Sequence, residues 1–277
     1  MGEDVHTLPE GDAVNGVTLL GDEVFVLRLK MERDQVEVYD VITYRLQRRM
    51  SLPNCRGVTD ITSCEYYHCV YVADPSNMCI YRVKAQRGTT TWWAVNDMPA
   101  GLSVNKAHNV LVTCILVGKI KEFSSYGDLL RIMALPYDVI HPWHAIQLTS
   151  GQYVVCHGTD NDFRRRVCVL SADCSHIVHV HGGQPGRNIG QLNDPIRLAV
   201  DDNEFVFVAD MRNQRVTLLS PTLNYVRQVV SRDNLNWYPI RLALDIQRRR
   251  LYVAENVADN EFEWSRWVSG RVVEFIV

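Results

Sequence analysis

Short apolar segments recur along the whole chain, and each is followed by a polar turn and a second segment rich in valine and aromatic residues. Apolar and polar positions alternate within these segments with the two-residue period of β-strands, and the 3.6-residue period of amphipathic helices is missing. The clearest second segment is Val206–Asp210, which reads Val-Phe-Val-Ala-Asp. This pattern predicts an all-β protein.

The strand-turn-strand unit is a repeat that occurs six times. Its second strands align at intervals of 40 to 53 residues, at Leu27, Ala73, Thr113, Cys156, Ala209 and Ala254. A repeat of about 45 residues filled with short strands is typical of propeller blades. We therefore expect one domain over residues 1–277, an all-β six-bladed β-propeller of four-stranded antiparallel blades. Its blades should start near residues 13, 57, 99, 142, 195 and 239.

The sixth repeat reaches Val277 just after its third strand, so one outer strand of its blade is unaccounted for. The segment Val-His-Thr-Leu at residues 5–8 precedes the first repeat and has no other role in the pattern. We expect residues 5–8 to complete blade 6, because this pairing would join the first and last blades through backbone hydrogen bonds.

The fifth repeat carries a family resemblance. It contains Gly190-Gln191-Leu192-Asn193-Asp194-Pro195, then Leu198-Ala199-Val200-Asp201 and Val206-Phe207-Val208-Ala209-Asp210. This segment closely resembles an NHL repeat, and the resemblance extends over essentially the whole chain. It is strongest to the propellers that end the tripartite-motif proteins of animals. In those proteins the propeller binds RNA or protein for a ubiquitin-ligase front half.

The resemblance implies a substrate-recognition domain of a ubiquitin ligase. The sequence has no paired cysteine and histidine pattern of a RING or B-box, and no coiled-coil heptads, so we expect no ligase chemistry in this chain. Fold alone does not determine function, since propellers serve both as enzymes and as binding platforms.

Charge and cysteine content limit the binding partners and the cellular compartment that we expect. The net charge of −3, from 29 basic and 32 acidic residues, argues against a surface that coats nucleic acid or an anionic membrane. No apolar run reaches the roughly 18 residues of a membrane span, and no signal-peptide pattern is present. We expect a soluble, cytoplasmic and monomeric domain with reduced core cysteines. Cys64 and Cys69 could face each other across a hairpin and oxidise in a secreted protein.

The enzyme hypothesis makes a specific prediction about the propeller axis. Some NHL-type propellers resemble peptide-amidating lyases, which hold zinc through histidines at the start of the innermost strands. The residues at that position here are Gly16, Asp60, Gly101, His144, Arg197 and Arg241. Arginine has no lone pair to offer a cation and repels it, so one imidazole, one carboxylate and two guanidiniums cannot replace three imidazoles. We expect no lyase-type zinc site.

A calcium site of the gluconolactonase kind is the other enzyme alternative. Candidate oxygens lie on Asp60, Asp74, Asp210 and Glu255, but the last three recur at one repeat position. Recurrence at equivalent positions favours a structural role, in which an acidic side chain accepts hydrogen bonds from backbone amides, over a unique active site. We expect no catalytic residue, metal or cofactor, and a metal-dependent lyase or lactonase with an axial site is the alternative.

The binding hypothesis rests on a basic face. Loops that leave the second strands should share a face with the axial Asp60, His144, Arg197 and Arg241. They add Arg164, Arg165, Arg166, Arg212 and Arg215. Clustered guanidiniums suit phosphates or carboxylates, and the family resemblance suggests single-stranded RNA. The slightly negative charge favours a protein or peptide partner instead. A plain solvated charge run is the third alternative.

The blade 6 loop at residues 256–270 is long for a hairpin, acidic, and carries Trp264 and Trp267. Exposed tryptophans in a long loop are typical anchors for a protein partner. The alternative is that they fold back as a lid over the axial channel, because large aromatic rings are costly to leave in water. The sequence leaves both interpretations open.

Overall fold

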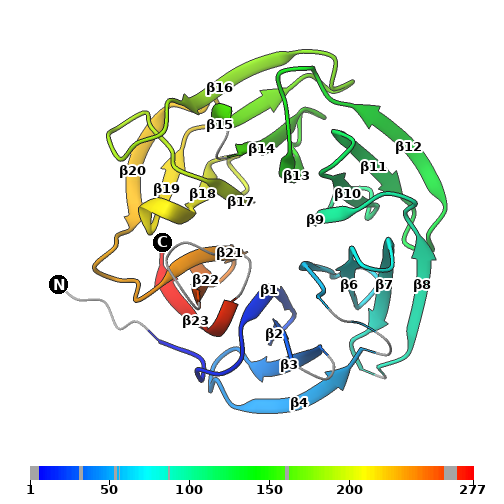
Figure 1. The fold of residues 1–277 in the computed structure, drawn as a ribbon. Coiled ribbons are helices and arrows are strands. Elements are labelled where there is room, and N and C mark those ends of the chain that lie inside the picture. The colour runs from blue at the N-terminus through cyan, green and yellow to red at the C-terminus, as the bar shows by residue number, and fades with distance from the viewer. Residues whose placement is uncertain are drawn as a thin grey trace.

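A computed structural model describes residues 6–30, 34–52, 55, 57–86, 88–159, 162–258 and 267–277. The strands form six antiparallel sheets arranged as a ring, and the sheets follow one another in chain order (Figure 1). Each sheet runs from an innermost strand at the axis to an outer strand at the rim. The protein is therefore the six-bladed β-propeller that the repeat pattern predicts.

Blades 1 to 3 each contain four strands. Blade 1 consists of β1 (Val14–Leu20), β2 (Glu23–Arg28), β3 (Gln35–Asp40) and β4 (Leu46–Ser51). Blade 2 consists of β5 (Asp60–Cys64), β6 (Cys69–Asp74), β7 (Cys79–Lys84) and β8 (Thr90–Ala94). Blade 3 consists of β9 (Pro99–Val104), β10 (Val110–Cys114), β11 (Lys119–Phe123) and β12 (Leu129–Ala134).

Blades 4 and 5 also contain four strands, and blade 6 contains three. Blade 4 consists of β13 (Pro142–Gln147), β14 (Tyr153–Thr159), β15 (Asp162–Leu170) and β16 (Ile177–Gly183). Blade 5 consists of β17 (Pro195–Val200), β18 (Val206–Asp210), the short 3-10 helix η1 (Met211–Asn213), β19 (Arg215–Leu219) and β20 (Tyr225–Val230). Blade 6 consists of β21 (Tyr238–Asp245), β22 (Arg250–Ala258) and β23 (Trp267–Ile276).

The N-terminal segment supplies the missing outer edge of blade 6. The amide of Leu8 donates to the carbonyl of Val272 at 2.9 Å, and the amide of Glu274 donates to the carbonyl of His6 at 2.8 Å. Leu8 is buried. The first and last blades are thus joined by backbone pairing between the two ends of the described chain, although residue 5 lies outside the described residues.

The repeat alignment agrees with the observed strand register. In each blade the aligned second-strand residue pairs with the residue expected near the axis. The pairs are Gly16 with Leu27, Asp60 with Ala73, Gly101 with Thr113, His144 with Cys156, Arg197 with Ala209 and Arg241 with Ala254. The hydrophobic core is divided into six clusters of buried side chains between neighbouring blades. This packing of β-branched and aromatic side chains holds the six axial positions in one layer.

The eight cysteines are free thiols and all are buried. Cys64 and Cys69 are opposite each other in the β5–β6 register, as the hairpin spacing predicts. Burial raises the pKa of the Cys156 and Cys114 thiols to about 12, so these thiols are protonated at neutral pH. Within the described residues there is no helix of the length and apolar character that a membrane crossing requires.

Candidate functional site

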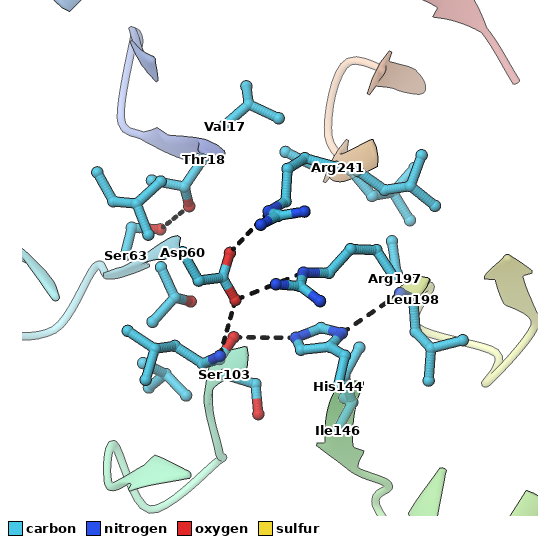
Figure 2. A pocket seen from close by; sticks show the side chains of 18 of the residues that line it. Val17, Thr18, Asp60, Ser63, Ser103, His144, Ile146, Arg197, Leu198 and Arg241 are labelled. Carbon is cyan, nitrogen blue, oxygen red and sulfur yellow. Dashed lines mark hydrogen bonds and ion pairs between the residues drawn. The ribbon is translucent and has the colours of Figure 1, made fainter. Parts of the chain in front are cut away.

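Four polar axial residues meet at the centre of the ring (Figure 2). They come from the inner strands of four blades: Asp60 from β5, His144 from β13, Arg197 from β17 and Arg241 from β21. All four are buried. We call these four side chains the axial network. The sequence prediction that they converge is correct, and their contacts decide what they can do.

Asp60 lies between the two arginines. Its Oδ1 is 3.5 Å from Nε of Arg241, and its Oδ2 is 3.7 Å from Nε of Arg197. The backbone amide of Leu102 also donates to Oδ2 of Asp60 at 2.8 Å. One carboxylate therefore faces two guanidiniums.

Arg197 and Arg241 donate most of their hydrogen bonds to backbone carbonyls. Arg197 donates from Nη1 to Ile196 at 2.7 Å and Trp143 at 3.3 Å, and from Nη2 to Ala100 at 2.9 Å. These carbonyls belong to three different blades, so the guanidinium ties the starts of β9, β13 and β17 together.

Arg241 links the other side of the ring in the same way. Its Nε donates to the carbonyl of Asn15 at 2.7 Å, its Nη1 to that of Ile240 at 2.6 Å, and its Nη2 to that of Thr59. Burial, and secondarily the nearby charge of Arg197, lowers the pKa of Arg241 to about 9, against the opposing effect of Asp60. The guanidinium remains charged at neutral pH.

His144 is held between two backbone groups. Its Nε2 lies 2.9 Å from the carbonyl oxygen of Leu102, and its Nδ1 accepts a hydrogen bond from the amide of Leu198 at 3.3 Å. This arrangement fits the neutral tautomer that carries its proton on Nε2. Burial lowers the pKa of His144 to about 4, so the imidazole is uncharged at neutral pH.

Packing explains why two axial positions, Gly16 and Gly101, are glycine. A Cβ at Gly16 would lie 2.5 Å from Cγ2 of Ile61, and a Cβ at Gly101 would lie 2.4 Å from the carbonyl oxygen of Trp143. The neighbouring inner strand occupies that space in both cases. The axial ring is therefore composed of two glycines required by packing and four side chains that form one polar network.

Two cavities open on either side of the axial network. The one in Figure 2 has a volume of about 310 Å³ and is lined by the later halves of the inner strands. The other, which we call the mouth cavity, has a volume of about 560 Å³ and lies at the starts of the inner strands. Arg197 and Arg241 reach both cavities, so they form the floor of the mouth cavity.

The mouth cavity has mostly apolar walls. Its apolar lining comes from the inner strands, the segment just before β9, the loops that follow the second strands and the start of β23. The larger apolar residues are Met98, Ile115, Leu116, Trp143, Ile196, Met211, Ile240 and Trp267. Asp194 and Arg212 also line it and form an ion pair at 3.2 Å. A concave site with apolar walls and a few polar groups has the usual composition of a ligand pocket.

The outer arginines of the predicted basic face already have protein partners. Arg215 donates to Oδ2 of Asp210 and to the carbonyls of Arg187 and Gln191, at 2.7 to 2.8 Å. Arg165 is buried and donates to Asn193.

Arg164 pairs with Asp138 at 3.1 Å, and Arg212 pairs with Asp194. Arg166 is half-buried in the middle of β15. Arg164, Arg165 and Arg166 thus lie within strand β15 and not in the expected loop. Oxygen atoms of this chain occupy part of the hydrogen-bonding capacity of Arg164, Arg165, Arg212 and Arg215.

Trp267 is the first residue of β23 and is half-buried at the mouth cavity. Its ring centroid is 6.3 Å from that of Tyr238. Trp264 lies outside the described residues. Of the two tryptophans singled out from the sequence, one therefore contributes to the cavity wall.

The recurring acidic residues bond to backbone amides, as the repeat analysis expects. Asp74 accepts from the amide of Asn77 at 3.0 Å. Asp210 accepts from that of Asn193 at 2.6 Å. Glu255 accepts from the amide of Trp237 at 2.9 Å. Among the described residues, no three His, Cys, Asp or Glu side chains are grouped so that they could hold a metal ion.

Sequence reasoning missed the apolar loop residues of the mouth cavity. Ile115 and Leu116 lie in the β10–β11 turn, and Leu116 is 70% exposed. A signal was present, because Ile115-Leu116-Val117 places three apolar residues in a turn where polar ones are usual. Met211 in η1 carried no comparable signal.

No protein-family model matches the sequence, and no curated protein matches it either. Solved structures do match. Virginiamycin B lyase from Staphylococcus aureus is 11% identical, with a TM-score of 0.63, over 99% of this chain and 89% of the lyase chain. Hydrazine synthase from Kuenenia stuttgartiensis is 12% identical, with a TM-score of 0.64, over 88% of this chain and 92% of that chain.

The β-propeller domain of Cps50 (Swd1) from Myceliophteria thermophila is a third match. It is 10% identical, with a TM-score of 0.61, over 95% of this chain and 83% of that chain. At such low identity these likenesses concern the fold alone. The chain is therefore similar in fold to a lyase, a synthase and the β-propeller domain of Cps50. Its own function has to be argued from its own site.

Proposed function

We propose that this chain is a non-catalytic recognition domain that binds a protein or peptide partner at the mouth cavity. The observation that carries this proposal is the composition of that cavity, which combines exposed apolar side chains at its rim with a charged floor. Leu116 is 70% exposed and Met98 is 38% exposed, although both line a concave surface. Exposed apolar residues around a pocket are typical of binding sites for protein side chains.

The axial network supports a binding role over a catalytic one. A catalytic base needs a lone pair directed at the substrate, and a metal ligand needs one directed at the metal ion. His144 has both ring nitrogens bonded to backbone groups, and Asp60 faces two guanidiniums and an amide. Groups engaged in this way hold the ring together and have little capacity left for proton transfer.

The pairing of the outer arginines favours a peptide over single-stranded RNA. RNA binding requires guanidiniums that can meet phosphates in solution. Arg215 and Arg165 are instead bonded to this chain's own carbonyls and side chains. The resemblance to tripartite-motif propellers suggests that the partner is a target protein selected for a ubiquitin ligase. The parent protein would then supply the ligase domains.

A selection from a phage-displayed library of short random peptides tests this proposal. The selected peptides should bind the unmodified chain and lose affinity for Leu116→Lys, which puts a charge at the rim of the mouth cavity. Ile42→Lys is the matched control, since Ile42 is 69% exposed in the β3–β4 loop, away from this cavity. Both substitutions are at exposed sites, so neither should unfold the protein.

Three outcomes would contradict the proposal. One is equal binding of the selected peptides to both lysine variants. A second is that a pool of random single-stranded RNA binds tightly with a steep salt dependence while no peptide is selected. A third is a change in the mass of a selected peptide after incubation with the chain, which would favour the lyase or lactonase alternative.

A further inference from the structure

The described groups at the floor of the mouth cavity have one positive charge in excess of their negative charge. Arg197 and Arg241 are both charged, and Asp60 is the one carboxylate within 4 Å of them among the described residues. His144 adds no charge, because its pKa is lowered to about 4 by burial. Asp194, also in the cavity, lies against Arg212. The described groups thus leave an excess of one positive charge.

A buried unbalanced charge is unfavourable and attracts an ion of opposite sign. Arg197 is 4% exposed and Arg241 is 9% exposed, so water screens them poorly. Each guanidinium has five N–H donors, of which three are bonded to carbonyls in each residue. Nε of Arg197 is buried and lies 3.7 Å from Oδ2 of Asp60, so the N–H groups left for a ligand are on the Nη atoms. Donor capacity therefore remains at the floor.

The apolar walls of the mouth cavity indicate which chemical group lies next to a bound anion. Trp143, Ile196 and Ile240 come from the inner strands just above the arginines, and Leu116 and Met211 come from the loops. An occupant that reaches the floor must lie against these apolar side chains. It therefore carries an apolar group next to its charge.

From this we infer that the mouth cavity recognises a carboxylate adjacent to a large apolar group, with the carboxylate at Arg197 and Arg241 and the apolar group against Trp143, Ile196 and Ile240. A carboxylate carries a single negative charge, which equals the excess at the floor. A phosphomonoester carries nearly two, which would leave a buried negative charge. Guanidinium forks bind carboxylates through paired hydrogen bonds. This inference rests on the proposed peptide-binding function and names the chemical group that is bound.

The test compares ligands that differ in charge at one group. The first pair is phenylpropionate and phenylpropanamide, which have nearly the same shape. The second set is a short peptide ending in phenylalanine with a free carboxylate, the same peptide as a C-terminal amide, and an amidated peptide with a glutamate before the phenylalanine. Calorimetry on the full chain should show each carboxylate form binding about tenfold to a hundredfold tighter than its uncharged counterpart.

The peptide set also identifies the source of the carboxylate. Tighter binding of the free C-terminus assigns the site to chain ends, and tighter binding of the glutamate peptide assigns it to acidic side chains. Either result supports the inference. Arg241→Met should remove the preference for carboxylate, whereas Arg227→Met, on the outer strand β20, should keep it.

Circular dichroism shows whether the Arg241 variant is folded. If it is not, the ligand pairs on the unmodified chain decide the matter alone. Equal affinity of the charged and uncharged ligands, while Leu116→Lys still weakens both, would overturn the carboxylate inference and leave the peptide-binding proposal in place. Binding that is insensitive to Leu116→Lys would overturn the peptide-binding proposal itself.

Discussion

The side-chain amide of Asn256 forms two buried hydrogen bonds with the backbone of Val14. Its Oδ1 accepts from the Val14 amide at 2.9 Å, and its Nδ2 donates to the Val14 carbonyl at 2.9 Å. The two residues are 242 positions apart and belong to blades 6 and 1. Blades 6 and 1 are thus joined twice, by backbone pairing of the N-terminal segment and by the side chain of Asn256.

Replacing Asn256 with alanine should destabilise the ring by about 3 kcal/mol, because it leaves a buried amide and a buried carbonyl of Val14 without partners. Asn224→Ala is the control, since Asn224 is exposed and its side chain bonds to the exposed Thr222. Urea unfolding measures both. Equal midpoints for the two variants would show that the Asn256 bonds contribute nothing to closure.

Deleting residues 1–9 should lower the melting temperature markedly. The deletion removes the buried Leu8 and the backbone bonds to Val272 and Glu274, and it takes away the Pro9 carbonyl to which Arg28 donates at 2.6 Å. Burial of one leucine alone contributes roughly 2 kcal/mol. A chain lacking only residues 1–5 retains these contacts and serves as the control. Identical melting of both shortened chains would contradict closure by this segment.

The blade register could be predicted from the sequence, whereas the contacts at the axis could not. The alignment of the six second-strand residues, from Leu27 in blade 1 to Ala254 in blade 6, was enough to place the axial residues. Each axial residue pairs with the aligned residue of its own blade. That Arg197 would bond to the Ala100 carbonyl, two blades away, depends on the width of the ring and on side-chain length. Periodicity contains no information about either.

The mouth cavity was missed for a related reason. A hydrophobic pattern indicates which residues are buried in strands, but Leu116 is an apolar residue in a turn, and its exposure depends on what the neighbouring blades leave uncovered. The sequence could not show which partners the arginines of the predicted basic face would have. Whether Arg215 is available to a ligand depended on Asp210 and two backbone carbonyls, which only the folded chain brings to it.

Asp60 should be coupled energetically to Arg241. Asp60→Asn removes the carboxylate that separates two buried guanidiniums, and breaking a buried ion pair from one side costs about 3 to 5 kcal/mol. In an Arg241→Met background the same substitution leaves one guanidinium without its repelling neighbour, so it should cost clearly less. A double-mutant cycle by urea unfolding gives the coupling. Additive losses would mean that the charges at the axis do not interact.

Stability should fall as the pH is lowered from about 6.5 to about 4, because two histidines stay neutral in the folded state. Burial lowers the pKa of His144 to about 4, and burial together with Arg166 lowers that of His157 to about 4. In the unfolded chain both titrate near 6.5. Between these values the unfolded state binds more protons than the folded state, so protonation favours unfolding. The loss should approach about 3 kcal/mol per histidine at the acidic end of the window.

His144→Gln and His157→Gln should each flatten the dependence of the unfolding free energy on pH within this window, whatever they do to stability at neutral pH. His176→Gln is the control, since His176 is exposed and its Nδ1 forms a hydrogen bond with the exposed Ser175. Denaturant titrations at a series of pH values measure the slope for each variant. If the slopes of the His144 and His157 variants match that of the control, the buried imidazoles do not govern acid sensitivity, and the neutral tautomer assigned to His144 at the axis is wrong.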